Sequence, residues 1–220
     1  MATRMVPDTR RHLAGLRRSS ELSQYSRDLV RPSAMKVSPK SVIRALNAVG
    51  VRPVLMGAYG LTSWRGSRAT EDVDVLVRKK DIAKSVRALE QRFPKLLVRD
   101  TPVVVRFIDP AQDMSVIDVM KPTQRVFQIV FRHTIRVGDS HDIPELEMAM
   151  ITKFAAMTSP HRQRLSKAQD AVDFMHIVAR NRDTMDRAKL LRLANSVYPD
   201  GGNEIMAIIE KVIAGEKFEI

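Results

Sequence analysis

VLMGAYGLTSWRGSRATEDVDVLV, residues 54–77, decides the fold because it sets two carboxylates one residue apart, shortly after a turn that contains glycine. Valines alternate with Asp72 and Asp74, and this period of two predicts a β-strand. Both carboxylates then lie on the same face of the strand. Two adjacent anions repel one another unless a cation lies between them. The pair therefore predicts a divalent metal site, with pairing to nearby arginines as the alternative.

Composition limits the classes of protein to consider. The chain has 220 residues, of which 44% are hydrophobic, enough for a packed core. Its 37 Lys and Arg against 25 Asp and Glu give a formal net charge of +12, which favours a polyanionic partner such as nucleic acid or a nucleotide. The absence of cysteine excludes disulfides, thiolate nucleophiles and cysteine-based zinc sites. No apolar run approaches the roughly 18 residues of a membrane span, so we expect a cytoplasmic protein with no membrane partner.

Two regions flank the segment that carries the aspartate pair. Residues 1–38 form a basic arm with eight Lys and Arg against three acidic residues, which is either a solvated extension or a surface that contacts RNA or a partner. Further along, the strand predicted at residues 114–120 places Asp118 among apolar residues. A carboxylate buried without a partner is costly, so Asp118 requires a metal, a basic group or solvent at a cleft.

The remaining elements predict an α+β fold. Before residue 134, hydrophobic periods predict helices at residues 39–49 and 81–93 and strands at residues 53–56, 95–98 and 103–107, with Asp81 as a helix cap. After a hairpin at residues 134–143, a helix begins at Pro144, a second helix has Leu165 and Val172 in its apolar stripe, and helices follow at residues 187–197 and 203–213. We therefore expect a mixed sheet with flanking helices at residues 39–143, preceded by the arm at 1–38 and followed by a helical domain at 144–220.

These residues together resemble the nucleotidyltransferase-fold, or polymerase-beta-like, superfamily, and most closely its AbiEii-type toxin nucleotidyltransferases of type IV toxin–antitoxin systems. In that branch a strand ends in Gly-Gly or Gly-Ser, a short helix follows, and Arg-x-Thr-x-Asp-x-Asp begins the next strand. Here Gly57-Ala58 and the segment from Arg68 to Asp74 stand at that spacing, and Asp118 corresponds to a third carboxylate on a later strand. The resemblance covers roughly residues 40–180.

The resemblance implies transfer of NMP from an NTP to a hydroxyl of an RNA acceptor, with the 3′ end of tRNA as the expected acceptor and an antitoxin protein as a further partner. It implies that two Mg²⁺ ions, replaceable by Mn²⁺, are held by the all-oxygen ligands Asp72, Asp74 and Asp118, which are also the catalytic residues. The residues that it assigns to nucleotide binding are Gly57, Ala58, Arg68, Thr70, Lys153 and Asp170.

Two alternatives stay open. The same chemistry can act on a small molecule such as an aminoglycoside, or the fold can serve as a non-catalytic module that binds RNA or a partner protein. Ala58 sustains the second alternative, because it lacks the hydroxyl that a Ser at this place offers to a phosphate. Individual residues also have structural interpretations: Arg68 can neutralise the aspartate pair, Thr70 can fix its loop, and Lys153 can pair with Asp170.

Overall fold

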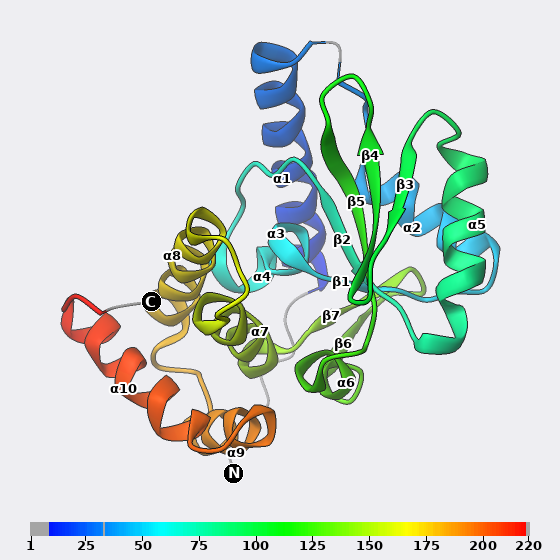
Figure 1. Ribbon diagram of the computed structural model, residues 1–220. Helices are drawn as coiled ribbons and strands as arrows, with labels where there is room; N and C mark the ends of the chain where they lie inside the picture. Colours follow the sequence, from blue (N-terminus) through cyan, green and yellow to red (C-terminus); the bar gives the residue numbers. More distant parts are fainter. Residues whose placement is uncertain (1–8, 33, 219–220) are drawn as a thin grey trace. The chain divides into compact units, whose positions relative to one another are not determined.

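The computed structural model describes residues 9–32 and 34–218. Within these residues the chain divides into two compact units, one ending at Pro144 and the other beginning at Glu145 (Figure 1). The first unit contains all the described strands, and the second is helical. The α+β class predicted from the sequence is confirmed.

A seven-stranded mixed sheet forms the centre of the first unit, in the order β3-β4-β5-β2-β1-β7-β6. β2 pairs in parallel with β5, and β1 in parallel with β7, whereas the other neighbours are antiparallel. The strands are β1 (Val54–Leu55), β2 (Val73–Leu76), β3 (Leu97–Asp100), β4 (Val104–Asp109), β5 (Met114–Met120), β6 (Thr134–Val137) and β7 (His141–Pro144). β2 and β5, the two strands that carry the predicted carboxylates, are therefore neighbours near the middle of the sheet.

One face of this sheet is closed by α2 (Pro39–Ala48) and α5 (Ile82–Arg92), which lie side by side (Figure 1). Their apolar stripes pack on the valines of β2 and on the inward residues of β4 and β5, such as Phe107 and Ile117. Because side chains alternate along a strand, the aspartates of β2 and β5 lie on the other face. The alternation that predicted the strand thus also decides which side of the sheet carries the carboxylates.

α1 (Thr9–Val30) falls within the predicted basic arm and packs against the short helices α3 (Gly57–Gly60) and α4 (Thr62–Arg65). Its buried residues are polar: His12, Ser19 and Ser23. The imidazole Nε2 atoms of His12 and His141 lie 3.1 Å apart, and the Thr62 hydroxyl lies 3.0 Å from Nδ1 of His12. Hydrogen bonds from buried polar side chains therefore hold α1 in place, together with Leu16, which packs against the hydrophobic core.

Two short elements complete the first unit: a 3₁₀ turn at Lys79–Asp81 and α6 (Arg125–Val130), which the sequence did not predict. Asp81 precedes α5, but its side chain does not cap the helix; it forms an ion pair with Lys84 at 2.9 Å. The prediction of a side-chain cap is wrong, because the 3₁₀ turn leads the chain into α5 with Asp81 already in a helical conformation.

The second unit consists of α7 (Leu146–Thr158), α8 (Arg164–Asn181), α9 (Arg187–Val197) and α10 (Gly201–Ala214). Pro144 belongs to β7, so the predicted helix begins two residues later. The predicted apolar stripe of α8 is wrong, since Leu165 is 86% exposed and Val172 is 38% exposed. The buried face instead carries Asp170 and Asp173 beside Phe174 and Ile177. In the described ranges, 9–32 and 34–218, no helix is long and apolar enough to cross a membrane.

Candidate metal centre

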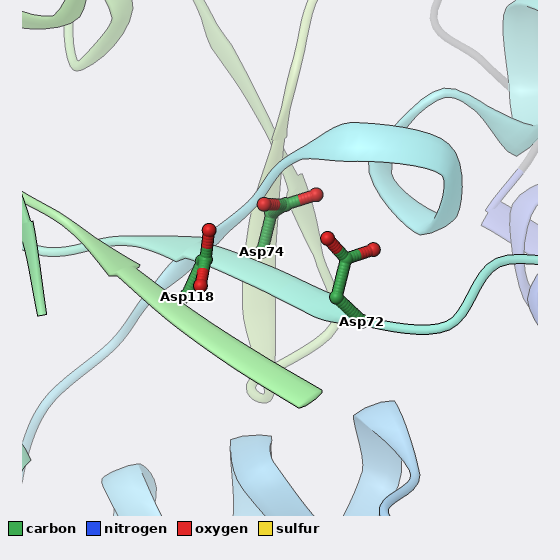
Figure 2. Close-up of side chains that lie close together, drawn as sticks. All are labelled: Asp72, Asp74 and Asp118. Carbon is green, nitrogen blue, oxygen red and sulfur yellow. The ribbon is translucent and has the colours of Figure 1, made fainter. Parts of the chain in front are cut away.

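Three carboxylates meet on the open face of the sheet. In the parallel pairing of β2 with β5, Asp74 lies directly opposite Asp118, and Asp72 lies immediately before β2. One oxygen from each of Asp72, Asp74 and Asp118 lies within 4.8 Å of the other two. Figure 2 shows the three side chains pointing to the same side of the sheet. All three are half-buried, so the cluster combines partial desolvation with access from solvent.

The donor set fits a hard divalent cation. Three carboxylates at this spacing repel one another, and an ion between them removes that repulsion. The ligands are all oxygen, the type that Mg²⁺ and Mn²⁺ prefer. The residues that could hold the ion are therefore the three that the sequence predicted, brought together from two strands by the register of the sheet.

Gly57 makes room for this cluster. The backbone N–H of Met56 donates to the carbonyl oxygen of Asp74 at 2.9 Å, which draws the end of β1 against β2. Gly57 then adopts φ +56°, a conformation that L side chains rarely adopt, and a Cβ there would lie 2.8 Å from Cγ of Asp74 and closer still to its Oδ2. The close approach to Asp74 therefore requires glycine at this position. Ala58 follows and is buried.

Hydroxyl groups orient two of the carboxylates. Thr70 Oγ1 donates to Oδ1 of Asp72 at 2.8 Å, and Ser115 Oγ donates to Oδ1 of Asp118 at 2.5 Å. The loop role considered for Thr70 is therefore present in the structure. Sequence reasoning missed Ser115. Residues three apart on a regular strand point to opposite faces, so nothing in the sequence suggests that Ser115 contacts Asp118. The register shift between β4 and β5 at Phe107 and Ile108 lies beside Ser115 and interrupts the regular alternation.

An arginine ladder continues from the triad along the sheet. Arg106 on β4 lies opposite Asp118, and its Nε is 3.7 Å from Oδ2 of that residue. Arg99 on β3 lies opposite Arg106. Sequence reasoning missed both arginines, because their position beside Asp118 depends on the register in which β3, β4 and β5 pair. Arg68, which was predicted to bind nucleotide, donates from Nη1 to the carbonyl of Ala69 at 2.9 Å.

α1 holds the loop that leads to Asp72. The Ser67 hydroxyl donates to the carbonyl of Gly15 at 3.0 Å, the Arg68 N–H to the Ser19 hydroxyl at 3.2 Å, and the Thr70 N–H to the Ser23 hydroxyl at 3.0 Å. The three positions on α1 are four residues apart and so lie on one face of the helix. Three successive turns of α1 therefore each fix one place in the loop.

The Ser23 hydroxyl has a second donor, the hydroxyl of Tyr59, at 3.1 Å. Burial raises the pKa of Tyr59 above its usual value, and the hydrogen bond to Ser23 opposes that rise. Tyr59 thus stays a neutral donor near neutral pH. Ser23 joins α1, α3 and the loop before Asp72 at a single buried atom.

Lys153 and Asp170 are brought together in the second unit. Lys153 Nζ lies 2.7 Å from Oδ1 of Asp170 and 2.8 Å from Oδ2 of Asp173, and Arg162 forms an ion pair with Asp170. The side chains of Lys153, Asp170 and Asp173 are almost fully buried. This network joins α7 to α8 and accounts for the buried aspartates of α8. The nucleotide-binding role of Lys153 and Asp170 stays a prediction.

Comparison with known proteins gives no match to a protein family and none to a curated protein. Among solved structures, the antibiotic-resistance factor ANT(2'')-Ia in solution aligns over 80% of this chain and 91% of its own, at 9% identity and a TM-score of 0.43. A crystal structure of ANT(2'')-Ia in complex with adenylyl-2''-tobramycin aligns over 78% and 94%, with the same identity and score.

Terminal uridylyl transferase 4 from Trypanosoma brucei with bound GTP aligns over 76% of this chain and 58% of its own, at 13% identity and a TM-score of 0.34. With likenesses this remote, a functional argument depends on the residues of the triad and their geometry.

Proposed function

We propose that this protein is a metal-dependent nucleotidyltransferase that moves NMP from an NTP to a hydroxyl of an RNA acceptor. The observation that carries the proposal is the in-register placement of Asp74 and Asp118 on parallel strands, with Asp72 beside them and one oxygen of each within 4.8 Å. Phosphoryl transfer requires little covalent chemistry from a protein, and depends on positioning and charge neutralisation. A carboxylate cluster that binds Mg²⁺ provides both.

Each residue of the site has a defined part in this proposal. Asp72, Asp74 and Asp118 would hold the ions, and the hydrogen bond from Thr70 fixes the orientation of the Asp72 carboxylate. When bound, Mg²⁺ neutralises the phosphate charge and lowers the pKa of the acceptor hydroxyl. Asp118, held by Ser115, accepts the proton of that hydroxyl. The acceptor oxygen forms a bond to the α-phosphorus, the bond from this phosphorus to the oxygen bridging to the β-phosphorus breaks, and pyrophosphate leaves.

The net charge of +12 supports a nucleic-acid acceptor, because a basic protein attracts polyanions over long range. We propose the 3′ end of a tRNA as the acceptor and, from the resemblance to toxins, an antitoxin protein as a partner. The nucleotide-binding residues of the proposal are those assigned from the resemblance: Gly57, Ala58, Arg68, Thr70, Lys153 and Asp170.

Label transfer tests the proposal directly. The protein is incubated with Mg²⁺, total cellular RNA and each of the four α-labelled NTPs in turn, beside Asp72→Asn and Asp74→Asn. Asp139→Asn is the matched control, because the Asp139 side chain is fully exposed in the β6–β7 turn. We expect label in RNA with the wild type and the control only, and none with EDTA. Transfer by either site variant at the wild-type rate would contradict the two-metal site.

A further inference from the structure

Arg99 and Arg106 form a pair of arginines on the β3–β4 hairpin, on the face of the sheet that carries Asp74 and Asp118. Arg99, Arg106, Asp118 and Asp74 stand opposite one another on four successive strands. Residues paired in this way lie on the same face, and neighbouring strands are about 4.8 Å apart. The two guanidinium groups therefore form a short basic row that leads directly away from the carboxylate triad.

The two arginines are accessible on this face. The side chain of Arg106 is 47% exposed, against 18% for Asp118, and Arg99 is exposed on an edge strand. Across residues 9–32 and 34–218, no carboxylate forms an ion pair with Arg99. Leu97, two residues before Arg99 and so on the same face, is 59% exposed. This part of the sheet is therefore open to a ligand.

The pairing of like charges points to an anion. Arginines directly opposite one another on adjacent strands repel and destabilise the sheet. Asp118 lies 3.7 Å from Nε of Arg106, but within residues 9–32 and 34–218 it forms no ion pair with Arg99, so it relieves that repulsion only in part. An oxyanion between the two guanidinium groups removes it, and the planar guanidinium matches the geometry of phosphate.

We propose that Arg99 and Arg106 bind the backbone phosphates of a single-stranded RNA acceptor and guide its 3′ end toward Asp118. The direction of the strand rests on the proposed function, in which Asp118 takes the proton of the acceptor hydroxyl. The binding itself does not. A cationic acceptor such as an aminoglycoside does not suit this row, because two arginines flank the approach to Asp118 on the β4 side.

Binding is measured without nucleotide or divalent metal, so the result does not depend on catalysis. The full-length protein is titrated against a 5′-fluorescein-labelled 12-nucleotide RNA in EDTA over a series of salt concentrations, by fluorescence anisotropy. The variants are Arg99→Gln, Arg106→Gln and the double variant. Arg87→Gln is the matched control. Arg87 is exposed on α5, which covers the opposite face of the sheet, and it forms no ion pair with any residue that the structure describes.

Each lost phosphate contact is expected to lower the slope of log Kd against log salt by about 0.7, which weakens binding about fivefold at 0.1 M salt. The double variant is expected to lose about 1.4 from the slope, and Arg87→Gln to keep the wild-type slope. Wild-type slope and Kd in the double variant, or an equal loss in Arg87→Gln, would overturn the proposal. Kanamycin, a cationic aminoglycoside, would also overturn the proposal if it bound the wild type and bound the double variant more tightly still.

The two proposals fail separately. If the slopes fall as expected but no NMP is transferred to any RNA, the RNA surface stands and the transferase does not. If NMP is transferred to RNA while the slopes and Kd values stay at those of the wild type, the transferase stands and this surface is overturned.

Discussion

Replacing Gly57 with alanine tests whether this residue makes room for the Asp74 carboxylate. Two costs are expected. First, the backbone stays at φ +56°, a conformation that destabilises the folded state of an alanine variant by about 1–2 kcal/mol. About 0.4–1 kcal/mol of this is offset, because alanine restricts the conformations of the unfolded chain. The new Cβ also overlaps Oδ2 of Asp74, so that the carboxylate must withdraw on the order of 1 Å, beyond the tolerance of about 0.5 Å for a functional constellation.

Gly50 offers a matched control for the first cost. It has φ +70°, and a Cβ built there meets nothing within 4 Å. Gly50→Ala therefore carries the backbone strain alone, and we expect it to lower the free energy of unfolding by about 0–1.6 kcal/mol. Gly57→Ala should lose a further 1–3 kcal/mol, about the cost of overpacking a well-packed site. The difference between the two variants isolates the contact with Asp74.

The free energies of unfolding come from urea titrations in EDTA, and metal affinity comes from the free Mn²⁺ signal in electron paramagnetic resonance. We expect Gly57→Ala to weaken Mn²⁺ binding at least tenfold, on the order of the effect of losing a partner that orients a metal ligand. Gly50→Ala should bind Mn²⁺ like the wild type. Equal stability losses in the two variants, together with wild-type Mn²⁺ affinity in Gly57→Ala, would refute the role given to Gly57.

Three further predictions follow from the charges of the structure. Asp118→Asn should melt in EDTA close to the wild-type temperature, because the loss of carboxylate repulsion is offset by the loss of the contact with Arg106, but should lose the rise in melting temperature that Mg²⁺ gives the wild type. Lys153→Met should lower the free energy of unfolding by about 3–5 kcal/mol in urea titrations, since it leaves two buried carboxylates without their ammonium partner. Burial lowers the pKa of His12 to about 4 and that of His141 to about 3, whereas a histidine in the unfolded chain has a pKa of about 6.5. Below pH 6.5 the unfolded chain therefore binds more protons than the folded protein. The free energy of unfolding should fall as the pH drops from 6.5 toward 4. His12→Gln should flatten this dependence in urea titrations at several pH values, and the exposed His161→Gln should not.

The aspartate triad could be predicted from the sequence because local patterns encode it. Alternating valines set the strand and the face of Asp72 and Asp74, and a carboxylate inside an apolar strand marked Asp118. Whether the two strands are neighbours is a matter of topology, and the resemblance to a known superfamily supplied that step. The register that sets Asp74 opposite Asp118 then came from the structure.

The wrong stripe on α8 and the missed arginine on β4 have a common physical origin, which is that partners distant in sequence change the role of a charged side chain. On α8, apolar periodicity favoured a stripe through Leu165 and Val172, but the buried ammonium of Lys153 draws Asp170 and Asp173 inward and turns that stripe toward solvent. Similarly, Arg106 carries no local signal and gains its place only by pairing with β5. The buried face of α8 does carry Phe174, Ile177 and Val178, but the aspartates among them made it look like the solvent face.

α1 shows the same limit in its strongest form. A helix that packs on a sheet needs an apolar stripe, but α1 packs along a loop, whose backbone N–H and C=O groups must be satisfied when they are covered. Small hydroxyl side chains meet this need, because they allow close approach and supply acceptors, as Ser19 and Ser23 do. The buried side of α1 is therefore polar, and the helix looks like a solvated basic arm when it is judged by hydrophobicity. The informative signal was the recurrence of small residues every four positions from Gly15 to Ser23. α1 therefore belongs to the residues that position Asp72.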